Sequence, residues 1–363
     1  MNVFSFYSTR LRHALLSATA ALIVGSAHAA SGPALEVVAE LAIRPGNVAA
    51  ADGNRVFATV HPFDGARGAQ LIEVTSRTGY KPWPSAALQN DGKTFGDDKI
   101  DSPLGIYADG KGTIWIADMG FNLGKTRIWA FDAKTGKQLQ RIVLDEAIAP
   151  KGSFLQDLVV DEKQGWIYLA DIANPGLVAV EIATGKSRRF GGHASLQADP
   201  AAVMRINGQA INFGGKPASV AVNPLTLSAD GETLYFGAMN GLAWYSVPAA
   251  LFRNGADDAT IGQAIKRVGA KPVSDGAATD PTGYHYFTNV NENGIDRLSP
   301  QGQLEPYVRD ARLDWPDSLH FGSDNWIYIS VNQLYRTQPF TGQPDAGKPP
   351  YRILRVRAEA AKK

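Results

Sequence analysis

One pattern of hydrophobic and polar positions recurs six times along the chain. An apolar segment leads into a turn with Asp, Gly or Asn, and a second apolar segment centred on an aromatic residue follows. Short apolar runs rich in β-branched and aromatic residues, separated by turn residues, predict β-hairpins. The six copies read NVAAADGNRVFATV from Asn47, LGIYADGKGTIWIAD from Leu104, DLVVDEKQGWIYLAD from Asp157, PLTLSADGETLYFGA from Pro224, DGAATDPTGYHYFTN from Asp275 and DSLHFGSDNWIYIS from Asp317.

Each hairpin is followed by a further apolar segment and often a polar turn, such as TRIWAFDAKTG after the second copy. Six such units predict an all-β fold, a six-bladed β-propeller, with a β-sandwich as the alternative. We expect residues 30–363 to form this single domain. Because ring closure removes exposed sheet edges, the C-terminal YRILRV should pair near the N-terminal ALEVVAELAI.

The N-terminal segment, residues 1–29, has the pattern of a signal peptide. Arg10 and Arg12 precede a short apolar run over residues 14–24, and Ala27-His28-Ala29 offers a small-x-small cleavage site. The run is shorter than the roughly 20 residues that span a bilayer. We therefore predict cleavage after Ala29 and a periplasmic or secreted mature protein. An uncleaved N-terminal anchor is the alternative.

Composition excludes several classes of site and partner. There are no cysteines, so disulfides and thiolate sites are excluded. Loss of Arg10 and Arg12 with the leader changes the formal net charge from +1 to −1, and no basic block remains. We therefore expect a small-molecule ligand or substrate, and neither nucleic acid nor membrane as a partner. The chain also lacks the motifs of serine hydrolases, P-loop proteins and nicotinamide dehydrogenases.

Polar residues occupy matching places at the start of the predicted inner strands. Counting back eleven positions from the aromatic of the second strand gives Asp157, Asp275 and Asp317. Asn223 lies twelve back, because its turn is one residue longer. Inner strands of a closed ring face one axis, so we expect these four side chains in one cavity. Two interpretations stay open, since the oxygens could bind Ca²⁺, Mg²⁺ or Mn²⁺ or could cap the strands locally.

Four blocks of sequence carry a family resemblance. They are SPLGIYADGKGTIWIADMG from Ser102, NPLTLSADGETLYFGAMNGLAWYSVP from Asn223, SDGAATDPTGYHYFTNVNENGIDRLSP from Ser274 and WPDSLHFGSDNWIYISVNQL from Trp315. They resemble the bacterial branch of the major royal jelly/Yellow protein family. The similarity extends from about Asn47 to the C-terminus. It implies a six-bladed propeller, and the family includes dopachrome-converting tautomerases and proteins that bind small aromatic amines.

The chain more distantly resembles the gluconolactonase/regucalcin propellers. The divalent-metal site of that family uses an Asn and an Asp that match Asn223 and Asp275, and Asp157 falls where the family has a channel Asn. The Glu of that site has no counterpart in this chain. This departure counts against lactonase chemistry, unless Asp317 fills the vacancy.

The leading hypothesis is an exported enzyme that acts on a small cyclic or polar metabolite in the channel. A divalent cation on Asp157, Asn223 and Asp275 would polarise a lactone carbonyl or stabilise an enolate, with Asp317 as the base. These roles give lactone hydrolysis or tautomerase-type isomerisation. We add His320 as a second catalytic candidate, and Asn47 and Trp315 as substrate-pocket residues. A non-catalytic ligand-binding propeller and a protein-interaction scaffold are the alternatives.

Overall fold

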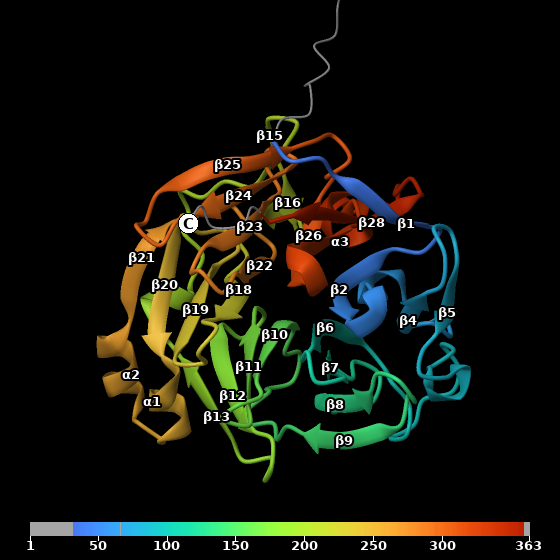
Figure 1. Cartoon of the computed structure of the whole chain (residues 1–363), viewed down its shortest axis with the longest axis horizontal. Helices are drawn as coiled ribbons and strands as arrows, with labels where there is room; N and C mark the ends of the chain where they lie inside the picture. Colours follow the sequence, from blue (N-terminus) through green and yellow to red (C-terminus); the bar gives the residue numbers. More distant parts are fainter. Residues whose placement is uncertain (1–31, 66, 359–363) are drawn as a thin grey trace, which may run out of the picture.

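The structure, a computed structural model, describes residues 32–65 and 67–358. The predicted leader and its cleavage site lie outside the described residues. In the part that is described, six four-stranded antiparallel sheets surround a central channel (Figure 1). The predicted six-bladed β-propeller is confirmed. No helix within these two ranges combines the length and the apolar composition needed to cross a bilayer.

Five blades follow one another along the chain, each running from its inner strand to its outer strand. The first blade consists of β2 (Pro45–Ala51), β3 (Arg55–Val60), β4 (Leu71–Val74) and β5 (Tyr80–Pro82), and the second of β6 (Pro103–Ala108), β7 (Thr113–Asp118), β8 (Arg127–Asp132) and β9 (Gln138–Val143). The third consists of β10 (Leu155–Asp161), β11 (Trp166–Asp171), β12 (Gly176–Glu181) and β13 (Ser187–Gly191), and the fourth of β18 (Val222–Leu227), β19 (Thr233–Ala238), β20 (Ala243–Pro248) and β21 (Lys266–Ala270). The fifth consists of β22 (Ala277–Thr279), β23 (His285–Asn289), β24 (Gly294–Leu298) and β25 (Leu304–Arg309).

The sixth blade joins the two ends of the described chain. It consists of β26 (Pro316–Phe321), β27 (Trp326–Val331) and β28 (Tyr351–Arg357), and its outer strand is β1 (Glu36–Leu41). β1 runs antiparallel to β28, with Glu36 opposite Arg355 and Leu41 opposite Tyr351. The predicted pairing of the first and last strands is therefore confirmed. It covers the edge that β28 would otherwise expose.

The hydrophobic core lies between neighbouring blades, because each sheet packs both of its faces against other sheets. The aromatic residues that marked the second strands supply much of this packing. Five of the six are buried, and Tyr235 is partly exposed. The buried five are Phe57, Trp115, Tyr168, Tyr286 and Tyr328.

Two long connections come together over one end of the channel. The first contains the short hairpins β14 (Arg205–Ile206) with β15 (Gln209–Ala210) and β16 (Asn212–Phe213) with β17 (Lys216–Pro217). The second contains α3 (Gln338–Thr341). The Gly214 N–H donates to Pro339 O at 2.8 Å, and the rings of Phe213 and Phe340 lie 4.9 Å apart. We call β16–β17 the cover hairpin.

A pair of short helices separates the two outer strands of the fourth blade. They are α1 (Ala249–Arg253) and α2 (Asp258–Ala264), which lie between β20 and β21 on the rim of the ring (Figure 1). Asp257 caps α2 by accepting a hydrogen bond from the Thr260 N–H at 2.7 Å, as a residue at the start of a helix commonly does. The helices lie away from the channel and do not position the candidate site.

Candidate functional site

Most inner strands contain a β-bulge close to their first residue. A bulge leaves an extra residue unpaired and re-aims side chains, here at the point where the strands enter the channel. Side chains near the start of the inner strands therefore lie at two successive depths along the channel axis. We call these depths the first and second levels, and the first is nearer the start of the strands. The pairing shifts lie between Pro45 and Val48, Pro103 and Ile106, Leu155 and Asp157, Val222 and Leu225, and Pro316 and Leu319.

Strand pairing identifies the equivalent channel positions and corrects one prediction. Tyr328 pairs with His320, and Tyr168 pairs with Val159. Three positions before these partners stand Asp317 and Gln156. In the third blade, Gln156 therefore occupies the position that Asn223, Asp275 and Asp317 occupy in their own blades. Asp157 lies one level further along the channel. The prediction missed this because the turn before Tyr168, like the one before Tyr235, is one residue longer than in the other blades.

Gln156 connects two carboxylates at the first level. Its Nε2 donates to Asp275 Oδ1 at 3.3 Å and to Asp317 Oδ1 at 3.1 Å. Asn223 Nδ2 also donates to Asp275 Oδ1, at 2.6 Å, and Trp315 Nε1 donates to Asp275 Oδ2 at 2.8 Å. All five side chains are buried. The structure therefore brings Asn223, Asp275 and Asp317 together with Trp315 at this level, while Asp157 lies outside it.

Burial sets the ionisation of these carboxyl groups. Desolvation raises the pKa of Asp275 to about 7, although the Trp315 and Asn223 donors oppose the rise. Desolvation and the neighbouring Asp275 raise the pKa of Asp317 and of Asp157 well above the usual range. Burial also lowers the pKa of Lys271 to about 7; its Nζ donates to Pro272 O at 2.8 Å. Asp275 therefore changes its charge near neutral pH.

A cavity of about 160 Å³ opens above this level, beneath the cover hairpin. We call it the upper cavity. Asp275, Asn223 and Gln156 contribute its polar surface, together with His61. Its walls are mainly aromatic and aliphatic, which is typical of small-molecule sites. They include Phe63, Phe154, Ile172, Phe213, Val220, Met239, Trp315, Leu334 and Phe340.

His61 is a neutral hydrogen-bond donor in the wall of the upper cavity. Burial, and secondarily the charge of Arg44, lowers the pKa of His61 to about 3. Its Nδ1 accepts the Phe63 N–H at 3.2 Å. A neutral imidazole carries one hydrogen, so this bond places it on Nε2.

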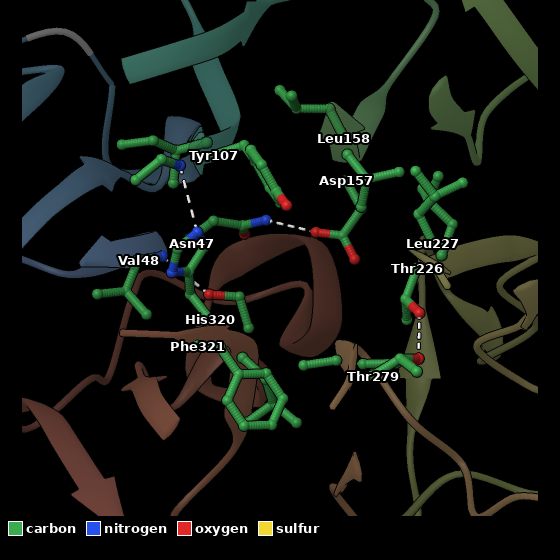
Figure 2. Close-up of a pocket in the computed structure, with 18 of the residues that line it drawn as sticks. Asn47, Val48, Tyr107, Asp157, Leu158, Thr226, Leu227, Thr279, His320 and Phe321 are labelled. Atoms are coloured by element: carbon green, nitrogen blue, oxygen red, sulfur yellow. Dashed lines mark hydrogen bonds between the residues drawn. The ribbon is translucent and has the colours of Figure 1, made fainter. Parts of the chain in front are cut away.

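A second cavity, of about 260 Å³, occupies the opposite end of the channel, where the inner strands end. We call it the lower cavity. Asn47 Nδ2 donates to Asp157 Oδ1 at 2.7 Å, and both residues line this cavity (Figure 2). Asp317 lines neither cavity. The predicted residues therefore surround one axis without sharing one cavity, because Asn223 and Asp275 line the upper cavity and Asp157 lines the lower one.

His320 lies in the wall of the lower cavity and not beside the Asp317 carboxylate. The Ala50 N–H approaches its Nδ1 at 3.3 Å, and the Ala108 N–H approaches its Nε2 at 3.2 Å. Burial lowers the pKa of His320 to about 4, so the ring is neutral and accepts only one of these two bonds at a time. In this position it connects the inner strands of neighbouring blades.

Hydrogen-bond donors surround the carboxylates where a divalent cation was predicted. Ca²⁺ and Mg²⁺ require several oxygen ligands. Both oxygens of Asp275 face N–H groups, and both oxygens of Asp317 accept bonds from Gln156 and Asn332. Among the described residues, no three acidic or histidine side chains are grouped to hold a metal ion. The residues in this arrangement do not fit a resident divalent cation, and no step below uses one.

A comparison with protein families places the fold and the channel in context. Residues 101–360 match the family model described as major royal jelly protein. The chain belongs to this family. Members similar to it include protein yellow of Drosophila melanogaster and of Drosophila erecta, each 27% identical over 229 residues. The alignment covers 56% of this chain and 40% of either relative, so the chain spans less than half the length of these curated relatives.

Solved structures with the same fold are enzymes of several kinds. A gluconolactonase from Xanthomonas campestris is 13% identical, with a TM-score of 0.53 over 89% of each chain. A luciferin-regenerating enzyme is 14% identical, with a TM-score of 0.54 over 90% of this chain and 96% of that one. Virginiamycin B lyase from Staphylococcus aureus is 14% identical, with a TM-score of 0.52 over 90% and 99%. At these identities, the likeness shows the fold alone.

Sequence reasoning missed three side chains of this major royal jelly protein family member. Gln156 was hidden by the longer turn of its blade. His61 lies just beyond β3, outside the repeated hairpin pattern, and only its contact with the cavity singles it out. Phe213 belongs to the cover hairpin, in a long Gly-rich connection whose sequence has no pattern that places single residues.

Proposed function

We propose that this protein is an enzyme that isomerises a small cyclic, largely apolar metabolite in the upper cavity, by a tautomerase-type proton transfer. One observation carries the proposal, namely a carboxyl group with a pKa of about 7 at the floor of an aromatic-walled cavity. A general acid–base group works best when its pKa lies near the working pH. Perturbed carboxyl groups in clefts are candidates for that role.

Asp275 would act as the base and then as the acid. Its carboxylate removes a proton from a carbon beside a carbonyl group, the C–H electron pair becomes a new C=C bond, and the carbonyl oxygen becomes an enolate. The Nε2–H of His61, in the cavity wall, would stabilise that oxygen, because a neutral imidazole donates without adding charge. The proton on Asp275 then passes to the oxygen, so no other reactant is consumed. Trp315 and Asn223 hold the carboxylate in place.

A non-catalytic binding propeller is the second candidate, because apolar walls with few polar groups equally suit a bound ligand. Turnover separates the two functions. The signal-peptide pattern of residues 1–29 supports a periplasmic or secreted enzyme, and the absence of basic blocks supports a small molecule as its partner.

The test uses dopachrome, from the substrate class that the family resemblance implies, and δ-gluconolactone. We expect purified protein to accelerate the absorbance decay of dopachrome, with kcat/KM rising as the pH increases through about 7, where Asp275 ionises. Asp275→Asn should lower kcat/KM by about 10²–10⁴-fold, the usual contribution of general acid–base catalysis. Thr226→Val, in the lower cavity, is the matched control and should retain full activity.

Two outcomes contradict the isomerase. Binding of dopachrome without turnover supports the non-catalytic propeller. If the protein hydrolyses δ-gluconolactone but does not turn over dopachrome, and Asp275→Asn abolishes the hydrolysis, the protein is a lactonase that uses the same carboxylate.

A further inference from the structure

The lower cavity has polar groups that the reaction in the upper cavity does not use. It lies at the opposite end of the channel and is lined by the inner strands and by the hairpin turn at Asp109 and Gly110. Its volume of about 260 Å³ is slightly below the range that holds drug-sized ligands, so an occupant must be small. Binding here does not depend on the proposed isomerase.

Asn47 lines this cavity and holds the Asp157 carboxyl in place. Its Nδ2 is committed to Asp157 Oδ1 at 2.7 Å and to Gln156 O at 3.0 Å. Its Oδ1 has no hydrogen-bond partner among the described residues, although the residue is only 2% exposed. Buried acceptors without a partner are rare and costly. This oxygen has less than 1 Å² of its own surface exposed, so it lies behind the cavity wall, and Asn47 contributes to the site by holding the Asp157 carboxyl through its Nδ2.

Hydroxyl groups line the opposite side of the same cavity. Thr226 Oγ1 and Thr279 Oγ1 share a hydrogen bond (Figure 2). Thr279 Oγ1 also bonds His285 Nδ1 at 2.7 Å. Tyr107 lines the cavity as well, and burial raises its pKa to about 12, so it keeps its hydrogen at neutral pH. The cavity therefore combines acceptors with hydroxyl donors.

The charge of the site favours a neutral ligand. No Lys or Arg is among the described residues that line the cavity. Burial and the neighbouring Asp275 favour the protonated form of Asp157, since both raise its pKa. An ammonium group or a metal ion would need a free carboxylate here. The other carboxyl group in the lining, Asp109, already accepts bonds from the Lys111 and Thr113 N–H groups and from Trp115 Nε1. A hydroxyl group needs no free carboxylate, because it donates and accepts at once.

We propose that the lower cavity binds a small neutral polyhydroxylated molecule, a monosaccharide or a sugar alcohol. The Asp157 carboxyl, which Asn47 Nδ2 holds, would take one hydroxyl group, and the Tyr107 hydroxyl would take its neighbour. The rings of Tyr107 and Phe321 give apolar surface for the C–H face of the molecule. The Thr226 hydroxyl receives a further hydroxyl on the far side.

Isothermal titration with D-glucose, D-mannitol and myo-inositol tests this site. We expect at least one of the three to bind the wild type with a stoichiometry of one. Tyr107→Phe removes a single hydroxyl and keeps the ring that lies 5.3 Å from the His320 ring. Loss of one hydrogen bond should weaken binding about five-fold. Leu227→Trp places a large ring in the lining and should abolish binding. Phe213→Ala, in the upper cavity, is the control and should bind as the wild type does.

Three results overturn the proposal. The first is the absence of heat from all three probes, which would indicate a channel filled with water only. The second is binding that persists unchanged in both Tyr107→Phe and Leu227→Trp. The third is preferential binding of tetramethylammonium or Ca²⁺, which would assign the cavity to cations. Thermal unfolding of each variant establishes whether it is folded. If Leu227→Trp does not fold, Tyr107→Phe alone tests the site.

Discussion

Replacing Asp275 by Asn removes an ionisable group from the channel and keeps its shape. Burial raises the pKa of Asp275 from 3.8 to about 7, so the folded protein keeps a proton that the unfolded chain releases between these two values. The free energy of unfolding of the wild type must then fall as the pH rises from about 4 to about 7. Asp275→Asn removes this contribution.

The size of the effect follows from the difference between the two pKa values. Each pKa unit corresponds to about 1.4 kcal/mol, so the full rise is worth roughly 4 kcal/mol, of which about 3 kcal/mol is lost between pH 4.5 and pH 7.5. Lys271 has the opposite effect on the free energy of unfolding at higher pH. Burial lowers its pKa from 10.5 to about 7, so above pH 7 the unfolded chain holds a proton that the folded protein has released. A comparison of these two pH values therefore measures mainly the carboxyl group.

Urea unfolding followed by tryptophan fluorescence supplies the measurement. We expect the stability of Asp275→Asn relative to the wild type to increase by about 3 kcal/mol between pH 4.5 and pH 7.5. Asp97→Asn is the control, because Asp97 lies at the surface. The difference in unfolding free energy between this variant and the wild type should change little between the two pH values. If the difference between Asp275→Asn and the wild type is the same at both pH values, Asp275 ionises normally and the proposed base loses its physical basis.

Four further predictions concern the fold, the leader and the metal. Asp118 and Arg127 form a buried ion pair at 2.7 Å. Asp118→Asn should therefore lower the free energy of unfolding by about 3–5 kcal/mol in urea titrations, whereas Asp97→Asn should leave it unchanged. Deletion of residues 36–41 should lower the melting temperature and cause aggregation visible by light scattering, because β28 becomes an open edge. Intact-mass analysis of exported protein should show cleavage after Ala29, and a retained leader would contradict it. Calorimetric titration of Ca²⁺ or Mn²⁺ should give negligible heat, and a saturable heat that Asp275→Asn removes would restore the predicted cation.

The repeated hairpins made the architecture predictable, because strand propensity and turn chemistry are local properties of the chain. The pairing of Glu36 with Arg355 followed from the need to close the ring. Counting back from the second-strand aromatic gave equivalent positions at Asn223, Asp275 and Asp317, because the length of the hairpin turn in each of these blades was read correctly from the sequence. A single extra residue before Tyr168 shifted the fourth position from Gln156 to Asp157, since one step along a bulged strand changes the level that a side chain occupies.

The rest of the site depends on contacts that no local pattern encodes. His61 follows a strand and acts through the position of its Nδ1 bond, which the hydrogen-bond network alone specifies. Phe213 reaches the cavity because its hairpin packs on Phe340, which belongs to a connection within the sixth blade. The separation into two cavities follows from the depth of each side chain along the axis. Counting residues identifies equivalent strands, but it does not give that depth.

The closure of the sixth blade also sets the order in which the chain can fold. Residues 36–41 are synthesised long before residues 351–357, so β1 must wait for its partner until the five intervening blades have been translated. Five blades can form from contiguous segments during that time, because each contains its own four strands. The last contact to form joins the first described strand to the last, and a separation of that size slows folding and leaves an unpaired strand exposed to other chains.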